Sequence, residues 1–155
     1  MREQLLFGTV MILITVIFHI SCLVLLANML KRMTIALKNV HVRISNLSTL
    51  VFSVIYIIGI HTVEAWTWAI VYLQMGEFDS LIRALYFSVV TLTTLGYGDI
   101  TLSESAQLLG TFEAMGGLIL FGASTAFLLA SMRHLFEDHN KLYGHHRDDH
   151  DHMDG

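Results

Sequence analysis

Three long runs of apolar residues restrict this chain to folds that cross a lipid bilayer. They cover residues 5–30, about 44–73 and about 105–132; the first contains no charged residue, and each of the others contains one acid. A helix needs about 20 apolar residues to cross the hydrocarbon core of a membrane. Only 14% of the 155 residues are charged, against about 25% in an average soluble domain. The sequence therefore predicts an all-α membrane protein with three transmembrane helices, the first of which is too long for a signal peptide.

A fourth apolar segment, residues 80–93, is too short to cross the bilayer and lies between the second and third runs. Asp79 or Ser80 can cap the start of a helix here, and a turn that contains two glycines follows. Backbone that is not helical is tolerated at membrane depth only where protein or a water-filled path surrounds it. The segment therefore predicts a short re-entrant helix followed by a loop.

Four basic residues between the first two runs set the expected orientation: Lys31, Arg32, Lys38 and Arg43. The positive-inside rule places this linker in the cytoplasm. We therefore expect a multi-pass protein of the cell membrane, with its N-terminus and the entrance to the re-entrant loop outside and its C-terminus in the cytoplasm. Residues 135–155 form a polar, acidic, histidine-rich tail that is expected to be disordered. Without a fixed scaffold its histidines are not expected to bind a metal, and no basic surface suited to nucleic acid is present.

Residues 93–99 read TTLGYGD and form the most specific motif of the chain. Neighbouring carbonyl groups of an ordinary strand point in opposite directions, so a segment that directs all of them toward one axis needs residues that accept a positive φ. Gly96 and Gly98 accept it because they have no Cβ. Carbonyl oxygens in such a row, with the hydroxyl of Thr94 at one end, can replace the water shell of a dehydrated cation. The motif therefore predicts a path for a cation.

Placed between two spanning helices and after a short apolar helix, this motif resembles the selectivity filter of the potassium channel family. The resemblance covers residues 44–134 and implies an outer helix, a pore helix, the filter and an inner helix. It implies no cofactor, and K⁺ ions bound in a filter that five residues form: Thr94, Leu95, Gly96, Tyr97 and Gly98. It also implies that Tyr86 of the pore helix supports Asp99 beside the filter. Because the ion path of the family needs four filter loops, the resemblance implies a homotetramer in the bilayer.

The chain departs from the family pattern at three points. The proline that usually follows the filter aspartate and the glycine–arginine pair at the start of the inner helix are absent, which leaves the shape of the outer mouth open. No span carries arginine at every third position, so no voltage sensor is expected. An additional helix in residues 1–43, together with the basic linker, precedes the pore module of residues 44–134 and the tail of residues 135–155.

Two other functions are compatible with the sequence. One is a weakly selective cation channel, and the other is a non-conducting regulatory or sensor subunit in which the tail is the active part. Tyr97 between two glycines argues against the first, and the complete filter argues against the second. No pairing of a nucleophile with a base is visible, so an enzyme is not expected.

Two local features are expected in the third apolar run. Thr101 and Glu104 have the spacing of a helix capping box. Gly116 and Gly117 fall where the resemblance places a gating hinge. The alternative is that these glycines allow helices to pack closely.

Ionisable residues inside membrane spans are costly and need partners. Counting about 1.5 Å per residue places His19 and His61 near the bilayer midplane, and Glu64 and Glu113 lie a few residues nearer the outer side. Two interpretations stay open: hydrogen bonds to helix neighbours, or a buried network of Glu64, Glu113 and His61 behind the pore helix that tunes the filter. At least one of the two acids is expected to be protonated, because burial disfavours the charged form, unless Arg83 pairs with it.

Overall fold

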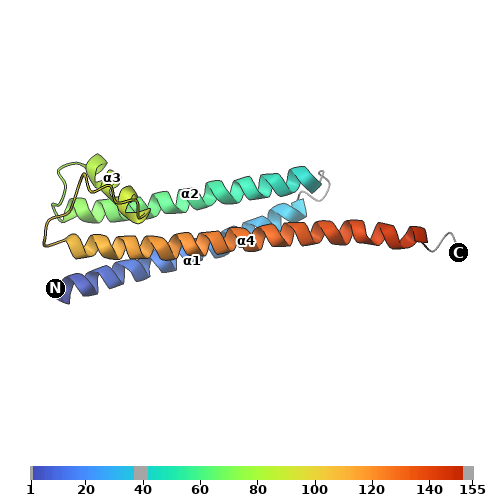
Figure 1. The fold of residues 1–155 in the computed structure, drawn as a ribbon, viewed down its shortest axis with the longest axis horizontal. Coiled ribbons are helices and arrows are strands. Elements are labelled where there is room, and N and C mark those ends of the chain that lie inside the picture. The colour runs from blue at the N-terminus through green and yellow to red at the C-terminus, as the bar shows by residue number, and fades with distance from the viewer. Residues whose placement is uncertain (1, 37–41, 152–155) are drawn as a thin grey trace.

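Three long helices lie side by side in the computed structural model, and a short fourth helix stands at one end of the bundle (Figure 1). The structure describes residues 2–36 and 42–151, with side chains over residues 2–33 and 47–133. The helices are α1 (Arg2–Ala36), α2 (Val42–Gln74), α3 (Leu81–Leu92) and α4 (Gln107–Asp151). Among the residues whose side chains the structure describes, three segments are long and apolar enough to cross a membrane: Arg2–Met33, Leu47–Gln74 and Gln107–Arg133. The prediction of three long apolar helices and one short helix is confirmed.

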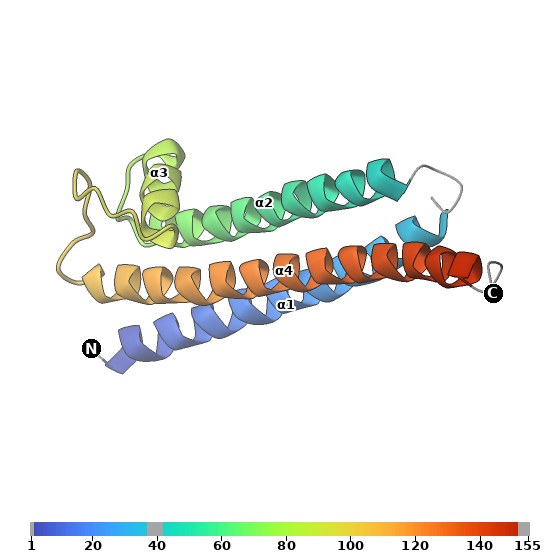
Figure 2. The same cartoon turned by 45° about the vertical axis from the view of Figure 1, so that its right-hand side comes forward.

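Helix α3 is packed on one face and uncovered on the other. Ser80, rather than Asp79, caps its start, because the Ser80 hydroxyl oxygen accepts a hydrogen bond from the Arg83 N–H at 3.4 Å. The buried residues of α3 are Ala84, Ser88, Val90 and Leu92. They face α2 and α4, and Figure 2 shows α3 crossing the end of α2. On the opposite face, Ile82 keeps 82% of its surface exposed.

A buried apolar cluster fixes α3 relative to the long helices. Its members are Met11, Ile12, Trp68, Ala69, Tyr72, Phe78, Ala84, Leu102, Ala106 and Leu109. The ring of Tyr72 meets the rings of Phe78 and Phe87 edge-on, with centroids 6.3 and 5.3 Å apart, a favourable arrangement of aromatic quadrupoles. Residues of all four helices and of the loops on both sides of α3 belong to the cluster. The cluster therefore fixes α3, and with it the start of the segment that follows.

The two connections on either side of α3 are tied to each other. Helix α2 ends where Gly76 takes a φ of +77°, and the N–H of Glu77 donates back to the carbonyl of Tyr72 at 3.1 Å. Glycine is favoured at such a left-handed helix end. The Glu77 carboxylate then accepts hydrogen bonds from both the N–H and the hydroxyl of Ser103, each at 2.8 Å. This contact holds residues 101–103 against the end of α2.

The expected capping box at Thr101 and Glu104 is wrong. Helix α4 begins only at Gln107, beyond both residues. The carbonyl of Ser103 accepts hydrogen bonds from the N–H groups of Ala106 at 2.8 Å and Gln107 at 3.0 Å. The contact between Ser103 and the end of α2 keeps the preceding residues out of the helix, so the first helical turn forms later than local sequence spacing indicates.

The expectation that residues 135–155 are disordered is also wrong for most of the tail. Helix α4 continues through the end of its apolar span and reaches Asp151. Extending an existing helix costs far less than nucleating a new one, and the chain contains no proline to interrupt it. The prediction of disorder used only the composition of the tail and did not include the helix that precedes it.

Candidate ion-conduction site

The TTLGYGD segment leaves the end of α3 in an alternating backbone conformation. Positive φ angles occur at Thr94 (+59°), Gly96 (+57°) and Gly98 (+75°). The N–H groups of Leu95 and Gly96 both donate to the carbonyl of Val90, at 3.0 and 3.2 Å, and so anchor the start of the segment on α3. A left-handed residue at every second position turns successive carbonyl groups toward the same side, which is the arrangement a row of cation ligands needs.

Thr94 is the part of this conformation that the sequence interpretation missed. Only the two glycines were expected to take a positive φ, because side chains with a Cβ rarely do so. The two-residue spacing of Gly96 and Gly98 is the signal that could have extended the pattern back to Thr94. The side chain of the preceding residue, Thr93, donates to the carbonyl of Val89 at 2.7 Å, which holds the start of the TTLGYGD segment in place.

A hydrogen bond from α3 supports the C-terminal end of the TTLGYGD segment. The Tyr86 hydroxyl donates to Oδ2 of Asp99 at 2.8 Å, the contact that the family resemblance implies. Donation to a carboxylate favours the protonated phenol, and this raises the pKa of Tyr86. Nearby, Arg83 pairs with Asp79 at 3.3 Å on the exposed surface. The alternative in which Arg83 pairs with Glu64 or Glu113 is therefore wrong.

Close packing, rather than bending, is what the structure shows at Gly117. Helix α4 passes so near the end of α3 that a Cβ added at Gly117 would overlap the carbonyl oxygen of Leu92. A Cβ added at Gly116 would only touch the side chain of Ile12 at 3.5 Å, an ordinary van der Waals distance. Gly117 thus allows α4 to pack closely against the end of α3, from which the TTLGYGD segment starts. A gating hinge at Gly116 and Gly117 stays a prediction.

Glu113 on α4 is buried against α2 and α3 in a small polar network. The Tyr72 hydroxyl donates to Oε2 of Glu113 at 2.7 Å, and the hydroxyl of Ser88 contacts Oε1. The same Ser88 oxygen lies 2.9 Å from the carbonyl of Ala65. Tyr72, Ser88 and Glu113 are all 0% exposed. Glu113 on α4 therefore links α2 and α3 through Tyr72 and Ser88.

The number of hydrogens in this network supports a protonated Glu113. The three contacts need three hydrogens, whereas the hydroxyls of Tyr72 and Ser88 supply only one each. A carboxylic acid at Glu113 supplies the third: its O–H donates to Ser88, Ser88 donates to Ala65, and Tyr72 donates to the other carboxyl oxygen. Every contact is then satisfied without a buried charge, which would be costly here.

Substituting Glu113 by glutamine should therefore leave folding nearly unchanged. A glutamine carries an N–H donor and a carbonyl acceptor in the places that the acid provides. Glu113→Leu has similar volume but leaves the buried Tyr72 hydroxyl without its partner, at a cost of about 1–3 kcal/mol, and Ser88 keeps only its hydrogen bond to the carbonyl of Ala65. Thermal unfolding of the purified protein should show a midpoint near wild type for Glu113→Gln and a much lower one for Glu113→Leu. Equal destabilisation by both variants would mean that Glu113 is needed in its charged form.

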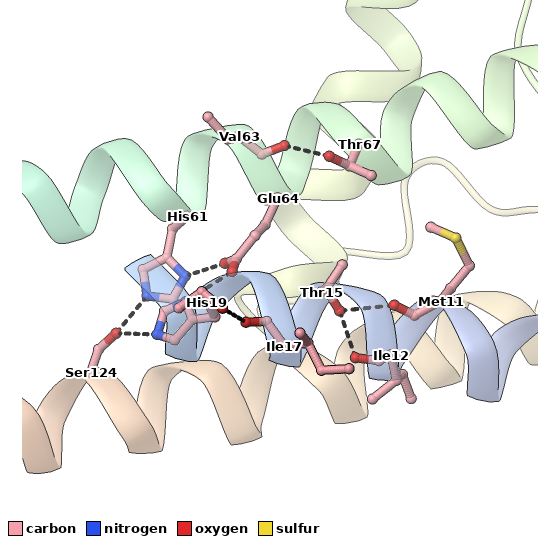
Figure 3. Close-up of polar contacts among 11 residues, drawn as sticks. Met11, Ile12, Thr15, Ile17, His19, His61, Val63, Glu64, Thr67 and Ser124 are labelled. Atoms are coloured by element: carbon pink, nitrogen blue, oxygen red, sulfur yellow. Dashed lines mark hydrogen bonds and ion pairs between the residues drawn. The ribbon is translucent and has the colours of Figure 1, made fainter. Parts of the chain in front are cut away.

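The structure separates the predicted network of Glu64, Glu113 and His61 into two. The carboxylate of Glu64 faces His61 on its own helix and His19 on α1 rather than α3 (Figure 3). Both imidazoles also contact the Ser124 hydroxyl on α4. Ser124 was not predicted, because a single serine in an apolar helix carries no signal of its own.

Comparison with known proteins agrees with the arrangement of helices and loop. A family model described as an ion channel matches residues 47–134, more than half of the chain. The potassium voltage-gated channel protein shk-1 of Caenorhabditis elegans is 31% identical over 68 residues, which are 43% of this chain and 13% of that protein. The voltage-gated potassium channel Kch of Escherichia coli (strain K12) is 40% identical over 62 residues, 37% of this chain and 15% of that protein. The similarity thus covers less than a sixth of each relative, and no solved structure matches the chain.

The matched residues contain α2 from Leu47 onward, α3, the TTLGYGD segment and the apolar part of α4. They are therefore the two long helices that flank the short helix and its loop, and α1 lies outside them. The ion channel match and the three candidate spans together indicate a multi-pass membrane protein. The chain belongs to the ion channel family and is distantly similar to potassium channels.

Proposed function

We propose that this chain is a subunit of a potassium-selective channel that conducts K⁺ passively through a tetrameric filter. The observation that carries the proposal is the alternating positive φ at Thr94, Gly96 and Gly98 within TTLGYGD. It supports a row of backbone oxygens that replaces the hydration shell of K⁺. Both named relatives are potassium channels. The proposal includes no voltage sensor in this chain, since none of its spans carries the regular arginine spacing that a sensor needs.

The uncovered surfaces of the single subunit support a homotetramer. Leu95 and Tyr97 in the filter segment are 56% and 66% exposed, although apolar and aromatic side chains at a filter need packed neighbours. Ile82 on α3 and Leu118 on α4 are 82% and 63% exposed. One chain supplies one row of carbonyls, and four copies around an axis supply the ring of oxygens that a dehydrated ion needs. Closed cyclic symmetry fits a pore on that axis.

Ion selectivity can be measured directly on the purified protein in a planar bilayer. With opposed gradients of potassium and sodium, the reversal potential should lie near the equilibrium potential of potassium, because filter oxygens replace the water shell of K⁺. A reversal potential near zero would support the weakly selective cation channel instead. An assembled tetramer that carries no current under any gradient would support the non-conducting regulatory subunit.

The proposed orientation has the N-terminus and the filter outside and the C-terminus in the cytoplasm. Figure 1 places the N-terminus and α3 at one end of the bundle and the C-terminus at the other, and the basic linker favours the cytoplasmic side. In a Cys22→Ser background, Glu3→Cys should react with a membrane-impermeant thiol reagent added to intact cells, and His150→Cys should react only after lysis. The reverse pattern would show that the bundle is inserted the other way round.

A further inference from the structure

A closed ring of four polar side chains links α1, α2 and α4 (Figure 3). Nδ1 of His19 lies 2.8 Å from Oε1 of Glu64, and Nδ1 of His61 lies 2.9 Å from Oε2. The two Nε2 atoms lie 3.0 and 3.2 Å from the same Ser124 oxygen. The side chains of His19 and Glu64 are 0% exposed, and that of His61 is 12% exposed. The ring is therefore buried apart from a small part of His61.

These four contacts need one hydrogen more than the neutral histidines and the serine contain. Each contact requires one hydrogen, so the ring requires four. Two neutral imidazoles and one hydroxyl supply three. One additional proton closes the ring, and with an ionised Glu64 that proton makes the group of four side chains neutral overall.

The additional proton belongs on the imidazoles. An imidazole is ordinarily a stronger base than a carboxylate, and each Nδ1–H then donates to one oxygen of Glu64. One Nε2–H donates to Ser124, and the Ser124 hydroxyl donates to the other Nε2. Phe121 on α4 stacks on His61 with ring centroids 4.1 Å apart, a position in which an aromatic face favours a cation. The ring thus connects α4 to the other two helices through Ser124 and Phe121.

Few other titratable groups face the ring. On α1, Cys22 is close enough to interact electrostatically with Glu64, and Tyr56 on α2 lies near Cys22. Helix α4 presents Ser124 and Phe121, which do not titrate. Among the side chains described over residues 2–33 and 47–133, the ion-pair partners of Glu64 are the two imidazoles. A single proton is therefore what balances the charge of Glu64.

A divalent metal ion suits this ring less well than a proton. The ligand atoms of His19, His61 and Glu64 lie within 4.8 Å of one another. Ligands of a tetrahedral metal at about 2.0–2.1 Å are separated by about 3.3 Å, whereas the two N···O distances here are 2.8 and 2.9 Å. One carboxylate would also leave a metal ion with an excess positive charge inside an apolar bundle, which is unfavourable.

We propose that His19, Glu64, His61 and Ser124 bind one exchangeable proton, and that this proton holds α4 against α1 and α2. When the proton leaves, the Ser124 hydroxyl can donate to only one of the two imidazoles, so one link to α4 is lost. Glu64 is also left with an unbalanced charge. The proton-binding site stands on the ring geometry alone, whereas its effect on current rests on the proposed channel function.

Glu64→Gln is the matched variant, because it closes the same ring without the additional proton. The glutamine amide N–H donates to one imidazole, its carbonyl accepts from the other, and two neutral imidazoles satisfy Ser124. The variant should therefore fold like the wild type. In ¹⁵N spectra of the full-length protein, with signals assigned by His19→Gln and His61→Gln, the wild type should show three protonated ring nitrogens shared by His19 and His61. Raising the pH should reduce these three to two, and Glu64→Gln should show two throughout.

Two protonated ring nitrogens in the wild type at every pH would overturn the proton site. A stoichiometric zinc ion that survives chelator treatment of the wild type and is lost in Glu64→Gln would overturn it in favour of a metal site. If the site exists and couples to α4, the potassium current should change over the pH range in which the third proton leaves, and Glu64→Gln should lose that change. Three protonated nitrogens with a current that is the same at every pH would overturn the coupling and leave the proposed channel function untouched.

Discussion

Replacing Gly96 by alanine is expected to abolish the potassium current while leaving the long helices folded. Gly96 has a φ of +57°, and an L-residue with a Cβ pays about 1–2 kcal/mol in the left-handed region. Thr94 already takes a φ of +59°, so the variant would carry two such residues within three positions. In a tetramer the cost is incurred four times around one axis. The filter backbone is expected to relax into another conformation and lose its row of carbonyl oxygens.

Gly59→Ala provides the control for this experiment. Gly59 lies on the exposed surface of α2, and nothing within 4 Å would meet an added Cβ. Alanine also has the higher helix propensity, so this variant should keep its full current. Circular dichroism should show equal helix content for both variants and the wild type. An undiminished, selective current in Gly96→Ala would contradict the proposed role of the filter backbone.

The second large effect is expected at Gly117, where alanine should disturb both stability and conduction. The added Cβ would overlap the Leu92 carbonyl oxygen, and a backbone atom cannot move aside as the end of a side chain can. Overpacking of this kind costs about 1–3 kcal/mol per site. It also displaces the end of α3 from which the filter segment starts. We expect a lower thermal midpoint and a loss of current.

Two neighbouring glycines distinguish packing from hinge bending. Gly122→Ala on the same helix meets nothing within 4 Å, and Gly116→Ala makes only an ordinary contact with Ile12. If close packing alone explains the effect of Gly117→Ala, then Gly116→Ala and Gly122→Ala should both match the wild type in thermal midpoint and current. If a hinge operates as well, Gly116→Ala should alter channel opening while its thermal midpoint stays near that of the wild type, because its added Cβ makes only an ordinary contact. The two outcomes separate the close-packing role from the predicted gating role.

The local features of this chain were largely predictable from its sequence. The number of long helices follows from the number and length of the apolar runs, because an apolar helix of about 20 residues is stable across the bilayer whatever its neighbours are. The short helix before the TTLGYGD segment and the positive φ at Gly96 and Gly98 also follow from residues close to them in the chain. The wrongly expected capping box is a failure of a local rule, because the contact of Ser103 with Glu77 overrode it. The conformation of Thr94 was missed although the two-residue spacing of Gly96 and Gly98 indicates it.

The sequence by itself determined that this chain has three apolar helices long enough to cross a membrane and one filter-like loop. Both features depend on residues that are close together in the chain: the hydropathy of each run and the conformational freedom of the glycines. Only the tertiary structure decided which buried polar groups meet. Glu64 and Ser124 reach His19 across 45 and 105 residues of chain, and Glu113 turns instead toward Tyr72 and Ser88. Similar depth in the bilayer made Glu64 and Glu113 look like one network. The rotation of each helix about its axis, set by the packing of neighbouring helices, separates them.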